Sequence, residues 1–232
     1  WAAAWALSWR PSPFIFQHYP LRWRLPAHRG AFPSSFSYGN DAVKAPSYDP
    51  EEAKKLLEES GWTDTDGDGY VDKDGQKLSI NWLTYPTRLE QPKLAEYAQA
   101  TLKDIGIDVQ VNNTSDHRTF AENGDFDVYV SSTTTAPTGD PEYFFTSTVV
   151  GSKNYGKYQN DEVTKLTEKL HQTFDKDERG KLAVELQQDI LDDDAFFFVS
   201  HLNMGIVTKS NVKGMAAHPC DYYEITADLD VE

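Results

Sequence analysis

The chain has 232 residues, of which 39% are apolar, so it can bury one sizeable core or two small ones. Its net charge of −15 disfavours binding to nucleic acid or to an anionic membrane surface, because both attract Lys and Arg rather than carboxylates. A single cysteine excludes an internal disulfide, and no run of about 18 apolar residues is available to span a membrane.

Residues 1–29 differ in composition from the rest of the chain. Residues 1–40 contain four arginines, four of the six tryptophans and no acidic residue. Prolines at positions 11, 13, 20 and 26 block a long helix, and the order of charged and apolar residues is not that of a secretory signal. We interpret residues 1–29 as an atypical leader, either authentic or a cloning or reading-frame artefact, and leave it out of the functional argument.

An ordered pattern begins at Gly30. Residues 30–50 are rich in Pro, Ser and Gly, which is typical of an extended loop. A helix is predicted to begin at Pro50, because Asp49 can cap its free amides and proline suits the first turn. Apolar residues recur on one side of this helix, and Gly61 provides a left-handed stop.

A strand, a helix and a second strand follow. Residues 78–85 and 107–112 alternate apolar and polar side chains, whereas residues 88–105 repeat apolar side chains with the period of a helix. This order predicts two parallel strands joined by a right-handed crossover. A short helix at 116–122 and a third strand at 126–130 continue the alternation.

Two charged helices are predicted at about 160–173 and 176–191, before a mixed carboxy-terminal region. The pattern from residue 30 onwards therefore predicts one α/β lobe with crossover helices. No G-x-S-x-G or H-E-x-x-H motif occurs and the histidines are scattered, so the sequence contains no nucleophile and base pattern that would indicate a hydrolase.

Residues 64–72 (DTDGDGYVD) match the first nine positions of a calcium-binding loop. Acids occupy positions 1, 3, 5 and 9, glycine occupies position 6, and a backbone carbonyl would serve at position 7. The ligands would be Asp64, Asp66, Asp68, the carbonyl of Tyr70, and Asp72. Position 12, however, is Gly75, where a bidentate Glu is expected, and a strand follows instead of a helix. The alternative is an ordinary Asp-Gly hairpin that binds no metal.

A loop rich in hydroxyls and rings follows the third predicted strand, at 131–145 (SSTTTAPTGDPEYFF). Ligands of α/β sheets bind beyond the carboxyl ends of the strands, so this loop is our candidate for ligand contact. Its hydroxyls can bond a carboxylate or amide, its rings can stack on a flat ligand, and its acid can pair with a cation. The candidates are Thr133, Thr134, Thr135, Pro137, Asp140, Tyr143 and Phe144. Alternatively, the hydroxyls bond their own backbone and the rings pack in the core.

Three further residues are predicted to line the same site. Tyr155 follows the aromatic segment, and His218 lies close to Tyr222 near the carboxyl end. The alternatives are that the tyrosines pack against their neighbours and that His218 bonds a loop carbonyl.

Four stretches stand in a fixed order along residues 30–232. They are FPSSFSYGN with YDPEEAKKLLEESGW, WTDTDGDGYVDKDGQKLSINWLT, LAEYAQATLKDIGIDVQV with GDFDVYV, and TGDPEYFFTS with NYGKYQNDEVTKL. Together they resemble the carboxy-terminal half of the family 5 solute-binding proteins, the dipeptide, oligopeptide and nickel receptors of ABC importers. The resemblance implies a periplasmic-binding-protein-like lobe over residues 30–232, with a mixed, mostly parallel sheet flanked by helices. Residues 1–29 would then be a remnant of the segment between two lobes.

The resemblance implies a binding function and not an enzymatic one. The chain would be the carboxy-terminal lobe of the substrate-binding component of an ABC importer, outside the cytoplasmic membrane in the periplasm or on a lipid anchor. It would act as a monomer that meets permease subunits. The cargo would be a small peptide or a metal chelate that carries nickel. No cofactor is required, and a structural calcium ion at residues 64–72 is left open as an alternative. The alternative is a calcium-dependent structural or binding module centred on residues 64–72.

Overall fold

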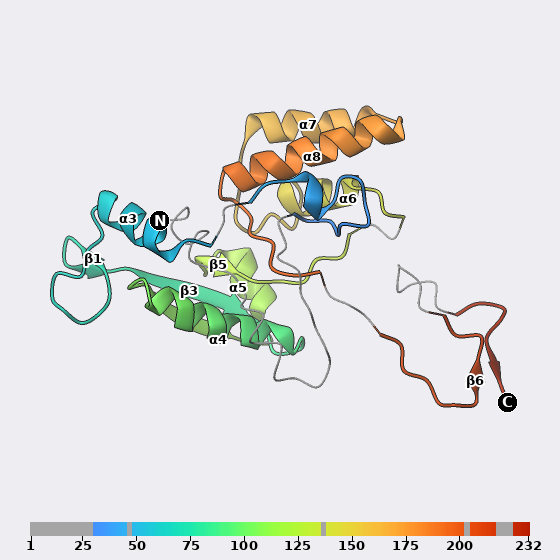
Figure 1. Ribbon diagram of the computed structural model, residues 1–232, viewed down its shortest axis with the longest axis horizontal. Helices are drawn as coiled ribbons and strands as arrows, with labels where there is room; N and C mark the ends of the chain where they lie inside the picture. Colours follow the sequence, from blue (N-terminus) through green and yellow to red (C-terminus); the bar gives the residue numbers. More distant parts are fainter. Residues whose placement is uncertain (1–29, 46–47, 136–137, 202–204, 217–224) are drawn as a thin grey trace.

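The computed structural model describes residues 30–45, 48–135, 138–201, 205–216 and 225–232 (Figure 1). A parallel sheet and the helices that flank it form one part of the fold. The other part contains two long helices that lie side by side at the top of the view. The pair consists of α7 (Asp161–Gln172) and α8 (Lys176–Asp192), close to their predicted bounds. The predicted α/β class is confirmed, with helices lying against a parallel sheet.

The central sheet consists of β3 (Ser79–Thr84), β4 (Asp108–Asn113) and β5 (Val128–Tyr129), in the order β4–β3–β5. Both pairings are parallel. Parallel neighbours require a crossover, and helix α4 (Glu90–Lys103) supplies it between β3 and β4. The predicted strand–helix–strand unit is therefore confirmed, and helix α5 (His117–Asn123) precedes the third strand as expected.

One face of β3 carries the first of two hydrophobic cores, called here the sheet core. Because side chains alternate along a strand, Ile80 and Trp82 point to the same face, and both are buried. Helix α4 covers this face with apolar residues three and four positions apart, which form one stripe of the helix. The sheet core also contains Leu57 of helix α3 (Pro50–Glu59), Leu94, Ala98 and Leu102 of α4, and Val109 of β4.

Helix α3 begins as its sequence predicts. The Asp49 carboxylate accepts a 3.0 Å hydrogen bond from the Glu52 amide, and Pro50 occupies the first turn, where no amide donor is needed. The helix ends at Glu59. Gly61 follows with φ of +83°, a left-handed conformation that glycine adopts at no steric cost.

The Asp-rich residues lead into a hairpin of two short antiparallel strands, β1 (Asp72–Lys73) and β2 (Gln76–Lys77). Its turn residues, Asp74 and Gly75, both have positive φ, as a type I′ turn requires. Gly106 contacts the base of the hairpin closely. Its carbonyl accepts a 2.8 Å hydrogen bond from the Val71 amide, and a Cβ at Gly106 would lie 2.9 Å from Cγ1 of Val71.

A second core, called here the helical core, involves α7, α8 and the short helix α6 (Glu142–Phe144). A π-helical turn, Phe145–Val149, follows α6 directly. A 3-10 turn at Asn40–Ala42 lies in the loop that precedes α3. The side chains of Asn160 and Asp175 cap the first turns of α7 and α8. The largest fully buried members of this core are Phe32, Phe145, Leu170, Leu182 and Leu186.

Residues 196–199, called here the core strap, join the two cores. They form no regular strand, but their side chains alternate. Phe197 and Val199 pack against the sheet core, whereas Phe196 and Phe198 pack against the helical core. Successive side chains of an extended chain point to opposite sides, so two of these four residues contact one core and two contact the other.

The carboxy-terminal region contains a second antiparallel ribbon, formed by β6 (Val212–Lys213) and β7 (Asp230–Val231). Figure 1 shows this ribbon extending away from the sheet and from α7 and α8. Across the described ranges, no helix combines the length and the apolar character needed to cross a membrane.

Candidate functional site

The segment 131–140, called here the threonine loop, leads from β5 to α6, and its described residues form no regular element. It starts at the carboxyl end of β5, whose partner in the sheet is β3. Loops at the carboxyl ends of parallel strands are the usual ligand-binding positions of α/β proteins, because the strands hold the loop ends rigidly while the loops vary. The loop predicted from the sequence to contact ligand therefore occupies such a position.

Two side chains of the sheet region hold the first part of the threonine loop. The Ser132 amide donates a 3.0 Å hydrogen bond to the hydroxyl of Tyr85, which directly follows β3. The side-chain amide of Gln91 donates a 3.1 Å hydrogen bond to the Ser132 hydroxyl. Gln91 lies in the first turn of α4 and is only 3% exposed, so packing restricts its orientation. The amino end of the loop is thus tied to the sheet.

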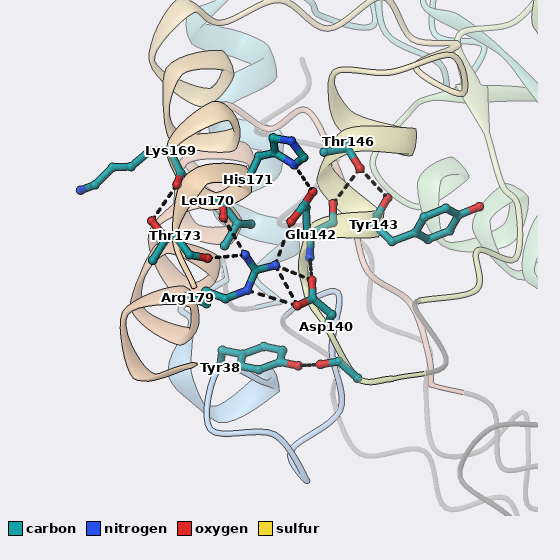
Figure 2. Close-up of polar contacts among 11 residues, drawn as sticks. Tyr38, Asp140, Glu142, Tyr143, Thr146, Lys169, Leu170, His171, Thr173 and Arg179 are labelled. Carbon is teal, nitrogen blue, oxygen red and sulfur yellow. Dashed lines mark hydrogen bonds and ion pairs between the residues drawn. The ribbon is translucent and has the colours of Figure 1, made fainter. Parts of the chain in front are cut away.

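Arg179 of α8 holds the other end of the loop (Figure 2). Its Nη2 lies 2.7 and 2.8 Å from the two carboxylate oxygens of Asp140, and its Nε lies 3.2 Å from one of them. The same carboxylate accepts a 2.9 Å hydrogen bond from the Glu142 amide, and the Tyr38 hydroxyl donates to the carbonyl of Gly139. Asp140 was predicted to pair with a cationic ligand group; its cationic partner in the structure is Arg179.

The Arg179 guanidinium also binds α6 and the end of α7 (Figure 2). Its Nη1 donates hydrogen bonds of 2.7 Å to the Leu170 carbonyl and 2.6 Å to the Thr173 carbonyl. Its Nη2 lies 2.9 Å from one carboxylate oxygen of Glu142, and the other oxygen lies 2.6 Å from Nδ1 of His171. A cation is favourable at these carbonyls because the carboxyl end of a helix carries a partial negative charge.

The hydrogen bonds of this network determine its protonation. Burial acts to raise the pKa of Glu142, but the hydrogen bonds from Arg179 and His171 outweigh it and hold that pKa below its ordinary value. Burial acts to lower the pKa of Arg179, and its hydrogen bonds to Glu142 and Asp140 reverse the effect. Glu142 and Arg179 are therefore both charged at neutral pH.

Threonine hydroxyls in the loop lack the partners that threonines have in the helices. Thr101 and Thr167 donate to backbone carbonyls four residues earlier, the usual arrangement in a helix. Within the described part of the chain, the hydroxyls of Thr133, Thr134 and Thr135 make no hydrogen bond. The first two of these side chains are exposed and the third is half-buried. Among the described residues, no backbone carbonyl accepts a hydrogen bond from these three hydroxyls.

The two aromatic residues that follow the loop have different surroundings. Phe144 is 4% exposed and packs edge to face against Phe32 and Phe145, so the core-packing alternative describes this residue. Tyr143 is 45% exposed, and its hydroxyl accepts a 3.2 Å hydrogen bond from Nζ of Lys153. Of this pair, Tyr143 is therefore the ring that a ligand can reach.

An aromatic cluster that sequence reasoning missed lies at the same end of the sheet. Tyr85 stacks on His117 with ring centroids 4.1 Å apart, and Nδ1 of His117 lies 2.6 Å from the hydroxyl of Tyr129. Tyr155, a predicted ligand residue, meets Tyr129 edge to face at 5.8 Å. Burial lowers the pKa of His117 and raises that of Tyr129 to about 12. The phenol therefore keeps its proton at neutral pH, and the imidazole is neutral in this contact.

Several predictions fall outside the described residues. Pro137, His218 and Tyr222 are in this group, and so is the predicted leader at 1–29. The predicted ligand-contact residues that the structure does describe lie on the threonine loop, on α6 and after the π-helical turn, whereas the predicted calcium ligands lie before the β1–β2 hairpin and at its start.

The Asp-rich loop brings three of its predicted calcium ligands together. Asp64, Asp66 and Asp72 each have a carboxylate oxygen within 4.8 Å of the others. Asp68 instead pairs with Nζ of Lys77 at 2.6 Å, and Tyr70 lies under the same ammonium group. These two residues were also predicted as ligands, the tyrosine through its carbonyl.

The same carboxylates organise the loop backbone. Asp64 accepts hydrogen bonds of 2.7 and 3.0 Å from the amides of Gly67 and Gly69, and Asp72 accepts bonds of 2.8 and 2.7 Å from the amide and hydroxyl of Thr65. The acids therefore have a structural role in the hairpin whether or not a cation binds. Calcium binding stays a prediction.

Comparison with known proteins identifies relatives of this chain. A sequence model described as "Bacterial extracellular solute-binding proteins, family 5 Middle" matches residues 24–156. The oligopeptide-binding protein AppA of Bacillus subtilis is 30% identical over 200 residues, and the nickel-binding periplasmic protein of Escherichia coli is 28% identical over 195 residues. These alignments cover 83% and 81% of this chain but 37% of each relative. The chain thus spans little more than a third of the length of the curated relatives it matches.

Solved structures share the fold. AppA from Bacillus subtilis in complex with a nonapeptide has a TM-score of 0.78 at 25% identity, over 94% of this chain and 45% of that one. NikA from Staphylococcus aureus in complex with Ni(L-His)2 has a TM-score of 0.77 at 23% identity, over 100% of this chain and 48% of that one. The predicted periplasmic-binding-protein-like fold is therefore confirmed.

Proposed function

The chain belongs to the bacterial extracellular solute-binding proteins of family 5, and from this membership we propose that it forms the carboxy-terminal ligand-binding lobe of a receptor that delivers cargo to an ABC importer. The relatives named above are binding proteins, and the proposed function is likewise capture without chemical change. The cargo would contact the threonine loop and the exposed ring of Tyr143.

This proposal rests on two properties of the threonine loop, its held ends and its unbonded hydroxyls. Both of its ends are tied down, through Ser132 on one side and Asp140 on the other. Between them, the exposed hydroxyls of Thr133 and Thr134 have no hydrogen-bond partner among the described residues. Hydroxyls presented by a loop with fixed ends can exchange water for the oxygen or nitrogen atoms of a ligand at a small cost in conformational entropy.

The chemistry of the loop favours an organic cargo over a bare cation. Asp140 is already paired with Arg179, and Ni²⁺ prefers imidazole nitrogen to neutral hydroxyl oxygen. We therefore propose that the cargo is a short peptide or a nickel chelate with an organic carrier, whose carboxylate and amide groups the hydroxyls can bond. Among the relatives, AppA was solved with a nonapeptide and NikA with Ni(L-His)2.

Isothermal titration calorimetry of the chain with Ni²⁺–histidine and with short peptides tests this proposal. One of the two probes is expected to bind. Replacing both threonines, Thr133→Val with Thr134→Val, should raise its Kd about tenfold, because two hydrogen bonds worth about 0.5–1.5 kcal/mol each are lost. Thr164→Val is the matched control, since that exposed side chain bonds the Asn160 carbonyl on α7. Binding of neither probe would contradict the proposal.

We further propose that the protein works outside the cytoplasmic membrane, in the periplasm or at the cell surface, and passes its cargo to permease subunits. The description of its family as extracellular supports this location. Fractionation of the source cells should recover the protein from the extracytoplasmic fraction, and recovery from the cytosol would contradict it.

A further inference from the structure

We propose that Arg179 is a positioning residue for the threonine loop. Its side chain is 13% exposed, and its guanidinium binds Asp140 at the carboxyl end of the loop instead of facing cargo. The contact holds Gly139 and Asp140, the carboxyl end of the loop that carries the threonine hydroxyls. Its consequence for binding rests on the proposed function of the loop as a cargo contact.

The contacts of this side chain require arginine. A single planar guanidinium bonds both oxygens of Asp140, one oxygen of Glu142 and two backbone carbonyls of the α7 end. Arginine carries five N–H donors in a rigid fork, whereas the three donors of lysine share one nitrogen. Arg179→Lys therefore keeps the positive charge but cannot make all of these contacts simultaneously.

Asp140 transmits this constraint to the loop backbone. The preceding carbonyl, that of Gly139, is held by the Tyr38 hydroxyl, and the Asp140 carboxylate also caps the Glu142 amide. Without the guanidinium, two carboxylates two residues apart would repel each other, and the loop would lose its strongest contact at this end. The amino end would be unaffected, because Ser132 is held independently from the sheet.

Hydrogen exchange of the cargo-free chain measures positioning by itself. In Arg179→Lys, the Glu142 amide, which donates to the Asp140 carboxylate, should exchange about tenfold faster than in wild type, because the guanidinium no longer holds that carboxylate in place. Amides of β3 should keep their wild-type rates. Asp140→Asn, which removes the charge and keeps the side-chain shape, should give the same local increase. Lys181→Gln is the matched control, because Lys181 lies on the same helix and pairs with Glu178 at the surface.

Binding distinguishes positioning from a purely structural role. The probe that binds wild type, Ni²⁺–histidine or a short peptide, should bind the folded Arg179→Lys variant with a Kd raised about tenfold. A purely structural role would instead accelerate exchange of the β3 amides and of the Glu142 amide alike.

A wild-type exchange rate at the Glu142 amide in both Arg179→Lys and Asp140→Asn would overturn the inference, and so would equal acceleration throughout the chain. If Arg179→Lys does not fold, Asp140→Asn provides the same comparison. Absence of probe binding by wild type would contradict the proposed function, and the exchange rates would then decide positioning on their own.

Discussion

Asp140 and Glu142 lie two residues apart, and their carboxylates would repel each other if the Arg179 guanidinium did not bind both. Asp140 is 40% exposed and Glu142 is 23% exposed, so both charges keep part of their hydration. The loss of Arg179 would leave two half-buried charges without a counter-ion, which is a larger penalty than the loss of a surface ion pair. One cationic side chain therefore determines how this acidic segment packs.

Glu142→Gln is expected to lower the free energy of unfolding at pH 7 by about 1–3 kcal/mol, because charge-assisted hydrogen bonds from Arg179 and His171 are lost. The folded-state pKa of Glu142 lies below its ordinary value. The contribution of the carboxylate is thus fully present above the unfolded-state pKa of about 4.3 and is lost as the pH falls through the folded-state pKa.

Urea unfolding of wild type and variant at a series of pH values checks this expectation. The difference between the two should shrink below about pH 4. A difference that stays constant down to about pH 3 would show that the charge of Glu142 contributes nothing to stability.

At the scale of elements, the β1–β2 hairpin is determined by its own turn and by one close contact with the rest of the fold. Asp74 and Gly75 adopt the positive φ of a type I′ turn, and the preceding acids bond the loop backbone. The hairpin then meets Gly106 at the end of the α4 crossover, where the Val71 amide bonds its carbonyl. This approach leaves no room for a side chain at Gly106.

Gly106→Ala is expected to destabilise the protein by about 2–4 kcal/mol. Positive φ costs about 1 kcal/mol for alanine, and the contact of its Cβ with Val71 adds roughly 1–3 kcal/mol. Gly75→Ala is the matched control: φ is also positive there, but a Cβ would meet nothing within 4 Å. Denaturant unfolding should show a clearly smaller loss for Gly75→Ala, and equal losses would refute the steric part of the argument.

The calcium hypothesis belongs to the same element. It predicts that Ca²⁺ raises the Tm of chelator-stripped protein and that Asp66→Asn removes this rise. Asp66 suits the test because its carboxylate accepts one amide bond, from Asp68, so the variant should keep the hairpin. Asp104→Asn, an exposed acid outside the loop, is the control. If calorimetry detects no heat when Ca²⁺ is added, the calcium hypothesis is wrong and the acids have only their structural role.

At the scale of the whole molecule, the main feature is that one short segment, the core strap, contributes side chains to both hydrophobic cores. The core strap packs alternate side chains into each core, and the threonine loop connects the end of the sheet to the helical core. Such shared contacts couple the stability of the two parts, because unfolding one exposes side chains that the other also buries. We therefore expect a single cooperative unfolding unit.

Leu186→Ala tests this coupling, because the side chain is fully buried in the helical core. Unfolding should become easier by about 2–5 kcal/mol, whereas Leu89→Ala, at a position 88% exposed, should change it by less than about 0.5 kcal/mol. Hydrogen exchange of the β3 amides, in the other core, should accelerate by the same factor as that of α7. Unchanged exchange in β3 would show that the cores unfold independently.

The sequence by itself determined the elements and their order. The cap at Asp49, the alternation at 78–85 and 107–112 and the periodicity of 88–105 each depend on residues a few positions apart, and the helix, strands and parallel crossover formed as predicted. It also singled out the threonine loop, since a loop after a parallel strand is a recognisable pattern. Such signals are local, because capping and periodicity are properties of neighbouring residues.

Only the tertiary structure decided the partners. Asp140 meets Arg179 across 39 positions, Gln91 reaches Ser132 across 41, and Tyr85 stacks on His117 from a different element. Phe144 turned into the helical core while its neighbour Tyr143 stayed exposed, although both are aromatic. A carboxylate or an aromatic ring can interact with several kinds of partner. Which partner it meets depends on how distant segments pack, because close packing and charge pairing are satisfied only in the complete fold.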